Sequence, residues 1–141
     1  MNGPRAIDPV EAASLFPLMR QLRTGLESAE GFAARVARQA RDGYQLLALD
    51  SEAGPAAVAG FRVAENLVHG RFLYVDDLVA DADARRQGLG ARLIDEFAVA
   101  ARRERCGKLV LDAALGNPLV HRFYFRQGML ATALRFTREL A

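Results

Sequence analysis

A glycine-containing segment in the second half of the chain has the composition of a phosphate-binding loop. Residues 85–91 read Arg-Arg-Gln-Gly-Leu-Gly-Ala and lie between a strand-like apolar run and an amphipathic helical one. Glycines let the backbone turn tightly, and the first N–H groups of a helix have no partner within it. The helix dipole and the Arg85 and Arg86 side chains add positive potential. The segment therefore predicts a cradle for a phosphate or pyrophosphate, the alternative being an ordinary helix start whose glycines only fit a turn.

Two other phosphate-binding loops are excluded by the residues present. A P-loop requires Gly-Lys followed by Ser or Thr, and this chain contains no such run. The dinucleotide fingerprint requires a third Gly or an Ala three residues after Gly90, and that position is Leu93.

Charged residues are distributed unevenly on the two sides of residue 84. The 19 basic and 17 acidic residues leave a net charge of +2, a surplus too small to indicate a nucleic-acid partner. Residues 85–108, however, hold seven basic and three acidic residues, a local charge of +4. An acidic cluster comes immediately before them and contains Asp76, Asp77, Asp81 and Asp83. The sign change indicates two ligand groups of opposite charge.

Hydrophobic periodicity predicts the elements that must position these residues. Asp8 is the expected N-cap of the first helix, which Pro17 kinks or splits. An antiparallel hairpin leading into a β-α-β crossover implies a mixed sheet in an α/β domain. The expected helices cover residues 8–23, 28–41, 88–103 and 117–126, and the expected strands cover residues 44–49, 57–64, 72–79, 109–113 and 131–137.

Length and composition limit the class of protein. The 141 residues suit a single domain over residues 1–141. One cysteine excludes an internal disulfide, and with only two histidines it leaves too few ligands for a Cys/His zinc site. No uncharged stretch approaches the roughly 18 apolar residues of a membrane helix. The N-terminus lacks the pattern of a signal peptide. We therefore expect a cytoplasmic protein without a membrane or nucleic-acid partner.

Two motifs in the chain resemble those of the GNAT superfamily of acyl-CoA N-acetyltransferases. The superfamily's Arg/Gln-x-x-Gly-x-Gly/Ala motif is matched by Arg85, Gly88 and Gly90. Its second element, an Asn followed by a helix that bears a Tyr, is matched by Asn117 and Tyr124.

A third motif narrows the resemblance and covers the strand before the glycine segment. Residues 74–79, Tyr-Val-Asp-Asp-Leu-Val, look like the acidic fourth strand of diamine acetyltransferases. One departure is Met129, which stands where the family usually has Phe after Gly128. The resemblance extends over nearly the whole chain, and three motifs in the right order and spacing form a specific signal.

The resemblance implies a GNAT fold: an α/β domain with a mixed, mostly antiparallel sheet, splayed at its centre to hold acetyl-CoA and flanked by helices. It implies acetyl-CoA as co-substrate and no metal, with the pyrophosphate on the N–H groups of residues 86–91. The end of the fourth strand would pair with the pantetheine arm, and the Leu78 N–H would polarise the thioester carbonyl. The residues expected to contact acetyl-CoA are Leu78, Val79, Ala80, Arg85, Arg86, Gln87, Gly88, Leu89, Gly90, Ala91 and Asn117.

Tyr124 is the candidate general acid under this resemblance. Attack of an amine on the thioester expels a thiolate, and a phenol can pass its proton to that thiolate as it forms. The alternative is an aromatic packing residue beside Phe123 and Phe125.

Asp76 is the candidate general base, because an ordinary amine is almost fully protonated at neutral pH. Strand alternation would place Asp76 with Tyr74 and Leu78 on one face, and Val75 with Asp77 on the other. A bulge in this strand would break that alternation. An unperturbed Asp is a poor base, so a water relay or a raised pKa would be needed. The alternative is that Asp76 and Asp77 only bind a cationic substrate or cap neighbouring loops.

The expected reaction is direct transfer of acetyl from acetyl-CoA to a primary amine in a ternary complex. The acidic strand favours a small cationic amine as acceptor. The alternatives are a protein lysine or N-terminal amine as acceptor, and a non-catalytic acyl-CoA-binding module. A homodimer would follow the family's common habit.

Overall fold

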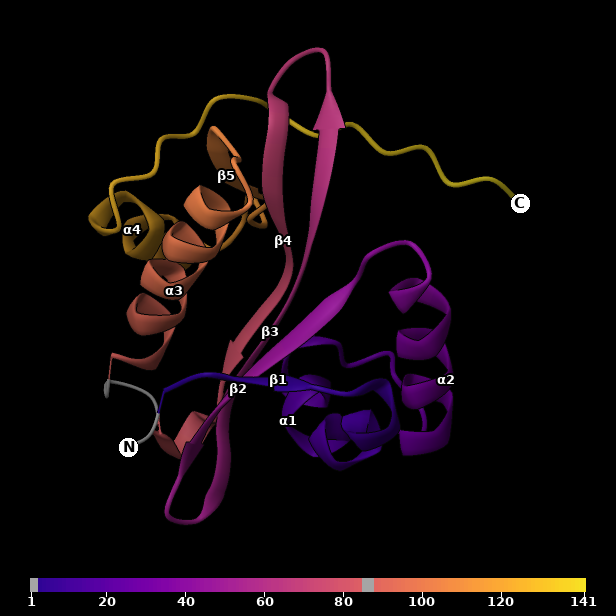
Figure 1. Cartoon of the computed structure of the whole chain (residues 1–141). Helices are drawn as coiled ribbons and strands as arrows, with labels where there is room; N and C mark the ends of the chain where they lie inside the picture. The colour runs from indigo at the N-terminus through magenta and orange to yellow at the C-terminus, as the bar shows by residue number, and fades with distance from the viewer. Residues whose placement is uncertain (1–2, 85–87) are drawn as a thin grey trace. The chain divides into compact units, whose positions relative to one another are not determined.

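The computed structural model describes residues 3–84 and 88–141, and Figure 1 shows its helices and strands. None of the helices in these two ranges is both long and apolar enough to cross a membrane. The elements in chain order are β1 (Arg5–Ile7), the 3-10 helix η1 (Pro9–Leu15), α1 (Phe16–Leu22), α2 (Ala29–Ala40), β2 (Gln45–Ser51), β3 (Gly54–Asn66), β4 (Gly70–Ala80), the 3-10 helix η2 (Ala82–Ala84), α3 (Leu89–Arg103), β5 (Lys108–Leu111) and α4 (Pro118–Arg126).

The five strands form one sheet in the order β1-β2-β3-β4-β5. The pairs β1/β2, β2/β3 and β3/β4 are antiparallel, so β2 to β4 are joined by hairpins and β5 is reached through the α3 crossover. A backbone hydrogen bond from Gly107 to Arg71, 3.0 Å long, ties the approach to β5 to the start of β4. The prediction of a mostly antiparallel sheet flanked by helices is confirmed.

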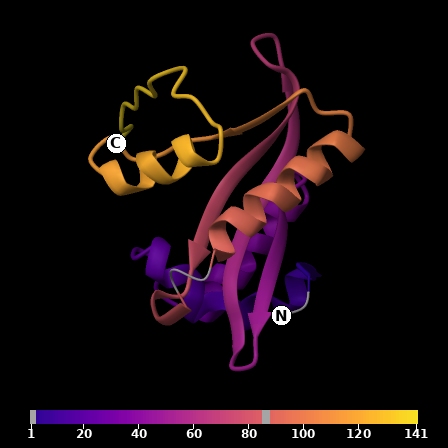
Figure 2. The same ribbon diagram turned by 90° about the vertical axis from the view of Figure 1, so that its left-hand side faces the viewer.

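Helices cover both faces of the sheet (Figure 1). Buried apolar residues lie between the helices and the sheet on each face. Val58 and Val79 pack with η1, α1 and α2 in a buried cluster that includes Leu15 and Met19. On the other face α3 lies across β3 and β4, as Figure 2 shows, and its Phe97 ring is fully buried. We call the two faces of the sheet the α1/α2 face and the α3 face, after the helices that cover them.

Local sequence explains the helix starts of the first half. The Asp8 side chain accepts a hydrogen bond from the Val10 N–H, 2.9 Å away, and begins η1. Pro17 falls in the first turn of α1, where its missing N–H costs nothing, and the expected helix is split there into η1 and α1. Ser28 caps α2 by accepting from the Gly31 N–H. The expectations for Asp8 and Pro17 are confirmed.

The chain forms two compact units, residues 1–110 and 111–141, and each is described by itself. The second contains α4 and an exposed segment after it. The prediction of a strand over residues 131–137 is wrong, because the segment has no ladder of hydrogen bonds in the structure. Alternating apolar residues fit a strand, but a strand also needs a neighbour with which to pair. The short β1 was not expected from the sequence.

Candidate acetyl-transfer site

A β-bulge in β4 shapes the acidic part of the candidate site. Gly60 of β3 pairs with Asp77, and its chain neighbour Phe61 pairs with Val75. Asp76 is therefore an extra residue between two ladder positions. A bulge of this kind bends the strand and re-aims the side chains beside it.

The bulge overturns the alternation expected along β4. Gly60 and Phe61 are consecutive, so they face opposite sides of the sheet, and cross-strand partners share a side. The Phe61 ring contacts Phe97, with centroids 5.2 Å apart, which assigns Phe61 and Val75 to the α3 face. Asp77 shares the α1/α2 face with Gly60. The prediction that Val75 and Asp77 lie on one face is wrong, because the extra residue shifts the parity.

Asp76 has an arginine partner on the neighbouring strand. Arg62 donates from Nε to the Asp76 Oδ2 at 3.0 Å, and its second guanidinium nitrogen donates to the Gln39 Oε1 of α2 at 3.1 Å. About a quarter of each charged side chain is exposed. Burial raises the pKa of Asp76, and the Arg62 guanidinium opposes that rise. The carboxyl is thus a stronger base than an exposed Asp.

Asp77 has two partners on the α1/α2 face. Arg23, just after α1, donates from Nε to Asp77 Oδ1 at 2.8 Å, and the Tyr44 hydroxyl donates to Oδ2 at 2.6 Å. Arg23 also donates to the Asp76 backbone carbonyl at 2.7 Å. The two carboxylates of the bulge are therefore balanced by two arginines, and the cluster as a whole carries no net charge.

The residues predicted at the pantetheine arm form the end of β4. Val79 is buried against the α1/α2 cluster, while Leu78 and Ala80 are half-buried. Beyond them, the Asp81 N–H donates to the Ala56 carbonyl at 2.8 Å, which holds the strand end in place.

The predicted phosphate cradle coincides with the start of α3. Gly88 is the N-cap residue and adopts a left-handed conformation with φ of 74°, which glycine tolerates best. The N-cap residue Gly88 has no side chain with which to cap this end, whereas Ser28 caps α2 and Asn117 caps α4. The helix begins at Leu89, so the N–H groups of Leu89, Gly90 and Ala91 belong to its unpaired first turn. The predicted residues Arg85, Arg86 and Gln87 lie outside the described residues.

Asn117 and Tyr124 belong to the second unit. Asn117 accepts a hydrogen bond from the Val120 N–H through Oδ1, 3.3 Å away, so it is an N-cap. The Tyr124 ring packs edge-on against Phe123, with centroids 5.2 Å apart, and burial raises the pKa of its hydroxyl. The phenol therefore stays protonated at neutral pH, as a general acid must.

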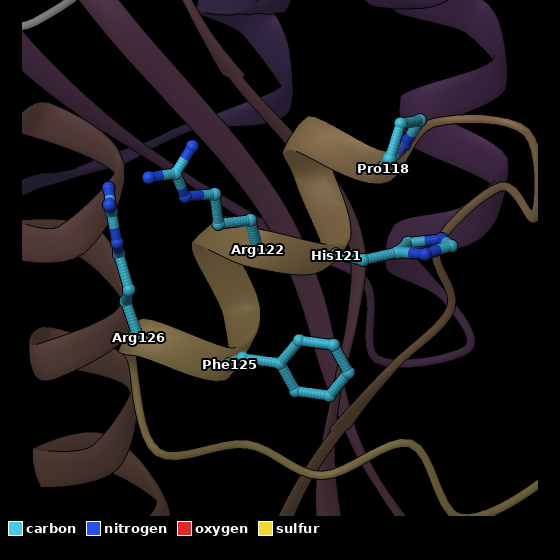
Figure 3. Close-up of a pocket in the computed structure, with 5 residues that line it drawn as sticks. All are labelled: Pro118, His121, Arg122, Phe125 and Arg126. Carbon is cyan, nitrogen blue, oxygen red and sulfur yellow. The ribbon is translucent and has the colours of Figure 1, made fainter.

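One side of α4 is hollowed. A cavity of about 520 Å³ is lined by Pro118, His121, Arg122, Phe125 and Arg126, which Figure 3 shows as sticks. The two arginines extend from the helix on one side and the rings of His121 and Phe125 on the other (Figure 3). None of these residues is a predicted catalytic residue, and His121 is engaged with the Ala114 carbonyl at 2.6 Å.

The acidic pair is recognisable in the sequence, but its partners are not. Arg62 and Tyr44 were missed, because they are 14 and 33 residues away from the carboxylates along the chain. Arg23 was not predicted as a partner either, since it is 54 residues away from Asp77 along the chain. The structure brings together Asp76, Asp77 and these three side chains.

Comparisons with known proteins agree on one family. Residues 13–129 match the acetyltransferase (GNAT) family. The chain is 31% identical over 114 residues to an uncharacterized N-acetyltransferase of Bacillus subtilis, YhdJ, covering 81% of this chain and 80% of that protein. It is 33% identical over 107 residues to glucosamine 6-phosphate N-acetyltransferase 1 of Oryza sativa subsp. japonica, covering 72% of this chain and 63% of that protein.

A solved structure supports the fold. The aminoglycoside N-acetyltransferase AAC(6')-Iy in complex with CoA superposes with a TM-score of 0.84, covering 98% of this chain and 94% of that chain. At 14% identity, this likeness concerns the fold alone.

Proposed function

Since the chain belongs to the acetyltransferase (GNAT) family, we propose that it transfers the acetyl group of acetyl-CoA directly to the primary amine of a small molecule. The observation that carries the proposal is the end of β4, where a bulge with two carboxylates is followed, eleven residues after Asp77, by the start of α3 at Gly88. In the sequence, the proposed amine-binding group therefore precedes this strand end and the proposed anion-binding group follows it.

The start of α3 is the proposed site for the pyrophosphate. The N–H groups of Leu89, Gly90 and Ala91 and the positive end of the helix dipole favour an anion there. Because Gly88 has no side chain, the N-cap residue itself does not occupy these donors. Arg85, Arg86 and Gln87, which precede them in the sequence, complete the proposed cradle.

The end of β4 is the proposed track for the thioester. Backbone groups of Leu78, Val79 and Ala80 would pair with the pantetheine arm, and the Leu78 N–H would donate to the thioester oxygen. A donor directed at that oxygen stabilises the negative charge that develops when the amine attacks. Asn117 is the proposed further contact, through its amide nitrogen, since Oδ1 caps α4.

Asp76 is the proposed base for the acceptor ammonium, directly or through a water. Its pKa, raised by burial, suits this role better than that of an exposed Asp. A cationic acceptor is proposed because its ammonium can bind beside the carboxylates of the bulge. Arg62 and Arg23 already balance these carboxylates, so we expect recognition of one amine group rather than a general attraction of polycations.

Tyr124 is the proposed general acid that protonates the departing thiolate. Its protonated hydroxyl can supply this proton, after which bulk solvent restores it.

Initial-rate kinetics test the direct transfer. With acetyl-CoA and an accepted amine both varied, a ternary complex gives intersecting double-reciprocal lines, and mass spectrometry detects no acetylated enzyme. Parallel lines together with an acetyl-enzyme would replace direct transfer by a covalent intermediate.

A further inference from the structure

Tyr44 is linked to both carboxylates of the bulge, directly to Asp77 through its hydroxyl and indirectly to Asp76 through Arg62. Its hydroxyl donates to Asp77 Oδ2 at 2.6 Å. The Arg62 guanidinium carbon lies 5.4 Å from the centre of its ring, within the range of a cation–π contact. Arg62 in turn holds Asp76 at 3.0 Å.

We infer that Tyr44 is a positioning residue for the acceptor side of the site, because its hydroxyl fixes Asp77 and its ring supports the arginine that fixes Asp76. This inference rests on the proposed function and assigns a role to a side chain outside the residues that would touch either substrate.

The surroundings of Tyr44 make it rigid enough for this role. It is buried, with 6% of its surface exposed, in the cluster between the sheet and α1/α2. Gly60, the ladder partner of Asp77, lies directly beneath the phenol, and a Cβ at Gly60 would overlap it. The glycine therefore makes room for Tyr44 at the one ladder position that faces the bulge.

The hydroxyl of Tyr44 has a fixed role as donor. Burial and the neighbouring Asp77 charge raise its pKa far above the usual range, so the phenol is protonated at neutral pH and can donate. Asp77 directly precedes Leu78 in the strand. A change in the backbone of the bulge would therefore also displace the Leu78 N–H that is proposed to face the thioester.

Two variants separate the parts of the side chain. Tyr44→Phe removes the hydroxyl and keeps the ring under Arg62. We expect kcat/KM for the amine to fall about tenfold, since a hydrogen bond to a charged group is lost, while the affinity for acetyl-CoA stays within about twofold. Tyr44→Leu removes the ring as well, and we expect a clearly larger fall.

Gly60→Ala should displace the phenol while keeping Tyr44 itself, because the added Cβ would overlap the hydroxyl and the ring. It should therefore also lower kcat/KM for the amine. Asp50→Asn is the matched control, because Asp50 forms an exposed ion pair with Arg5, 2.6 Å long, near the other end of β2. It should leave the kinetics within about twofold of wild type.

Backbone amide NMR signals of residues 76–78 give a readout that does not depend on turnover. They should shift in Tyr44→Phe and stay in place in Asp50→Asn. Unmoved signals in Tyr44→Phe would overturn the inference, whether or not the wild type is active. Failure of the wild type to acetylate any amine would refute only the proposed function. Shifted signals with unchanged kcat/KM in an active enzyme would also overturn it.

Discussion

Two opposing effects act on the ionisation of the Asp76 carboxyl group. Burial disfavours its charge, and the Arg62 guanidinium 3.0 Å away favours it. As the proposed base, it must be ionised, so activity should fall as the pH drops through its pKa. Because burial raises this pKa, the fall should begin at a higher pH than for an exposed Asp.

Removing the Arg62 charge tests this assignment. In Arg62→Gln the pKa of Asp76 should rise further, so the acid limb of the kcat/KM profile should move up by about one pH unit or more. The comparison variant is Arg5→Gln, which breaks an exposed pair with Asp50. An acid limb that moves equally in both variants, or in neither, would exclude Asp76 as the base.

The proposed role of Tyr124 as proton donor is tested by removing its hydroxyl. Tyr124→Phe removes the proposed proton donor and keeps the ring that packs on Phe123. We expect kcat to fall tenfold or more, with unchanged acetyl-CoA affinity by calorimetry. An unchanged kcat would remove Tyr124 from the mechanism.

At the residue scale, the sequence predicts which acidic residues belong to the polar cluster better than it predicts which side chains contact them. The Asp76-Asp77 pair is visible as two adjacent acidic residues in an apolar strand, and it does lie at a structured polar cluster. The face of each side chain was not predictable, because one extra residue reverses the parity. Tyr44 and Arg62 come from segments that only the folded sheet places beside β4.

The start of α3 is the element on which acetyl-CoA binding depends in this account. Gly88→Glu places bulk and negative charge at the uncapped helix end, so we expect acetyl-CoA binding to be lost.

Gly70→Glu is the matched control for that variant. Gly70 begins β4 in a left-handed conformation with φ of 67°, close to the 74° of Gly88, and both positions have open space for a side chain. The conformational strain that a non-glycine residue introduces is therefore similar in the two variants. They differ in whether the new carboxylate lies at the start of α3 or at the start of β4. Equal loss of binding in both variants, or retained binding in Gly88→Glu, would contradict the cradle.

Elements with a complete local signal were predicted well, and those defined by a distant partner were not. Asp8 and Pro17 carry the capping and splitting signals of the first helix, and the structure confirms both. Residues 131–137 have strand-like alternation without a ladder, and β1 is three residues long and exists through its pairing with β2. Pairing over such separations is not encoded in a local pattern.

At the scale of the whole molecule, binding and stability are linked. A ligand that binds only the folded state stabilises it by about 2.7 kcal/mol at a hundred times its Kd. We therefore expect acetyl-CoA to raise the Tm of the wild type and of Gly70→Glu, and not that of Gly88→Glu. Differential scanning fluorimetry measures this, and an equal rise in all three would place the binding site elsewhere.

The central proposal is that the chain acetylates a small primary amine. It is supported by the membership of the family, the mostly antiparallel sheet and the bulge of β4. The most direct test is release of the CoA thiol from acetyl-CoA across a broad panel of small primary amines, with Gly88→Glu as the negative control. We expect thiol release that depends on the amine concentration and is absent from the control. Acetyl-CoA binding without thiol release for any amine, small molecule or peptide, would contradict it and indicate an acyl-CoA-binding module.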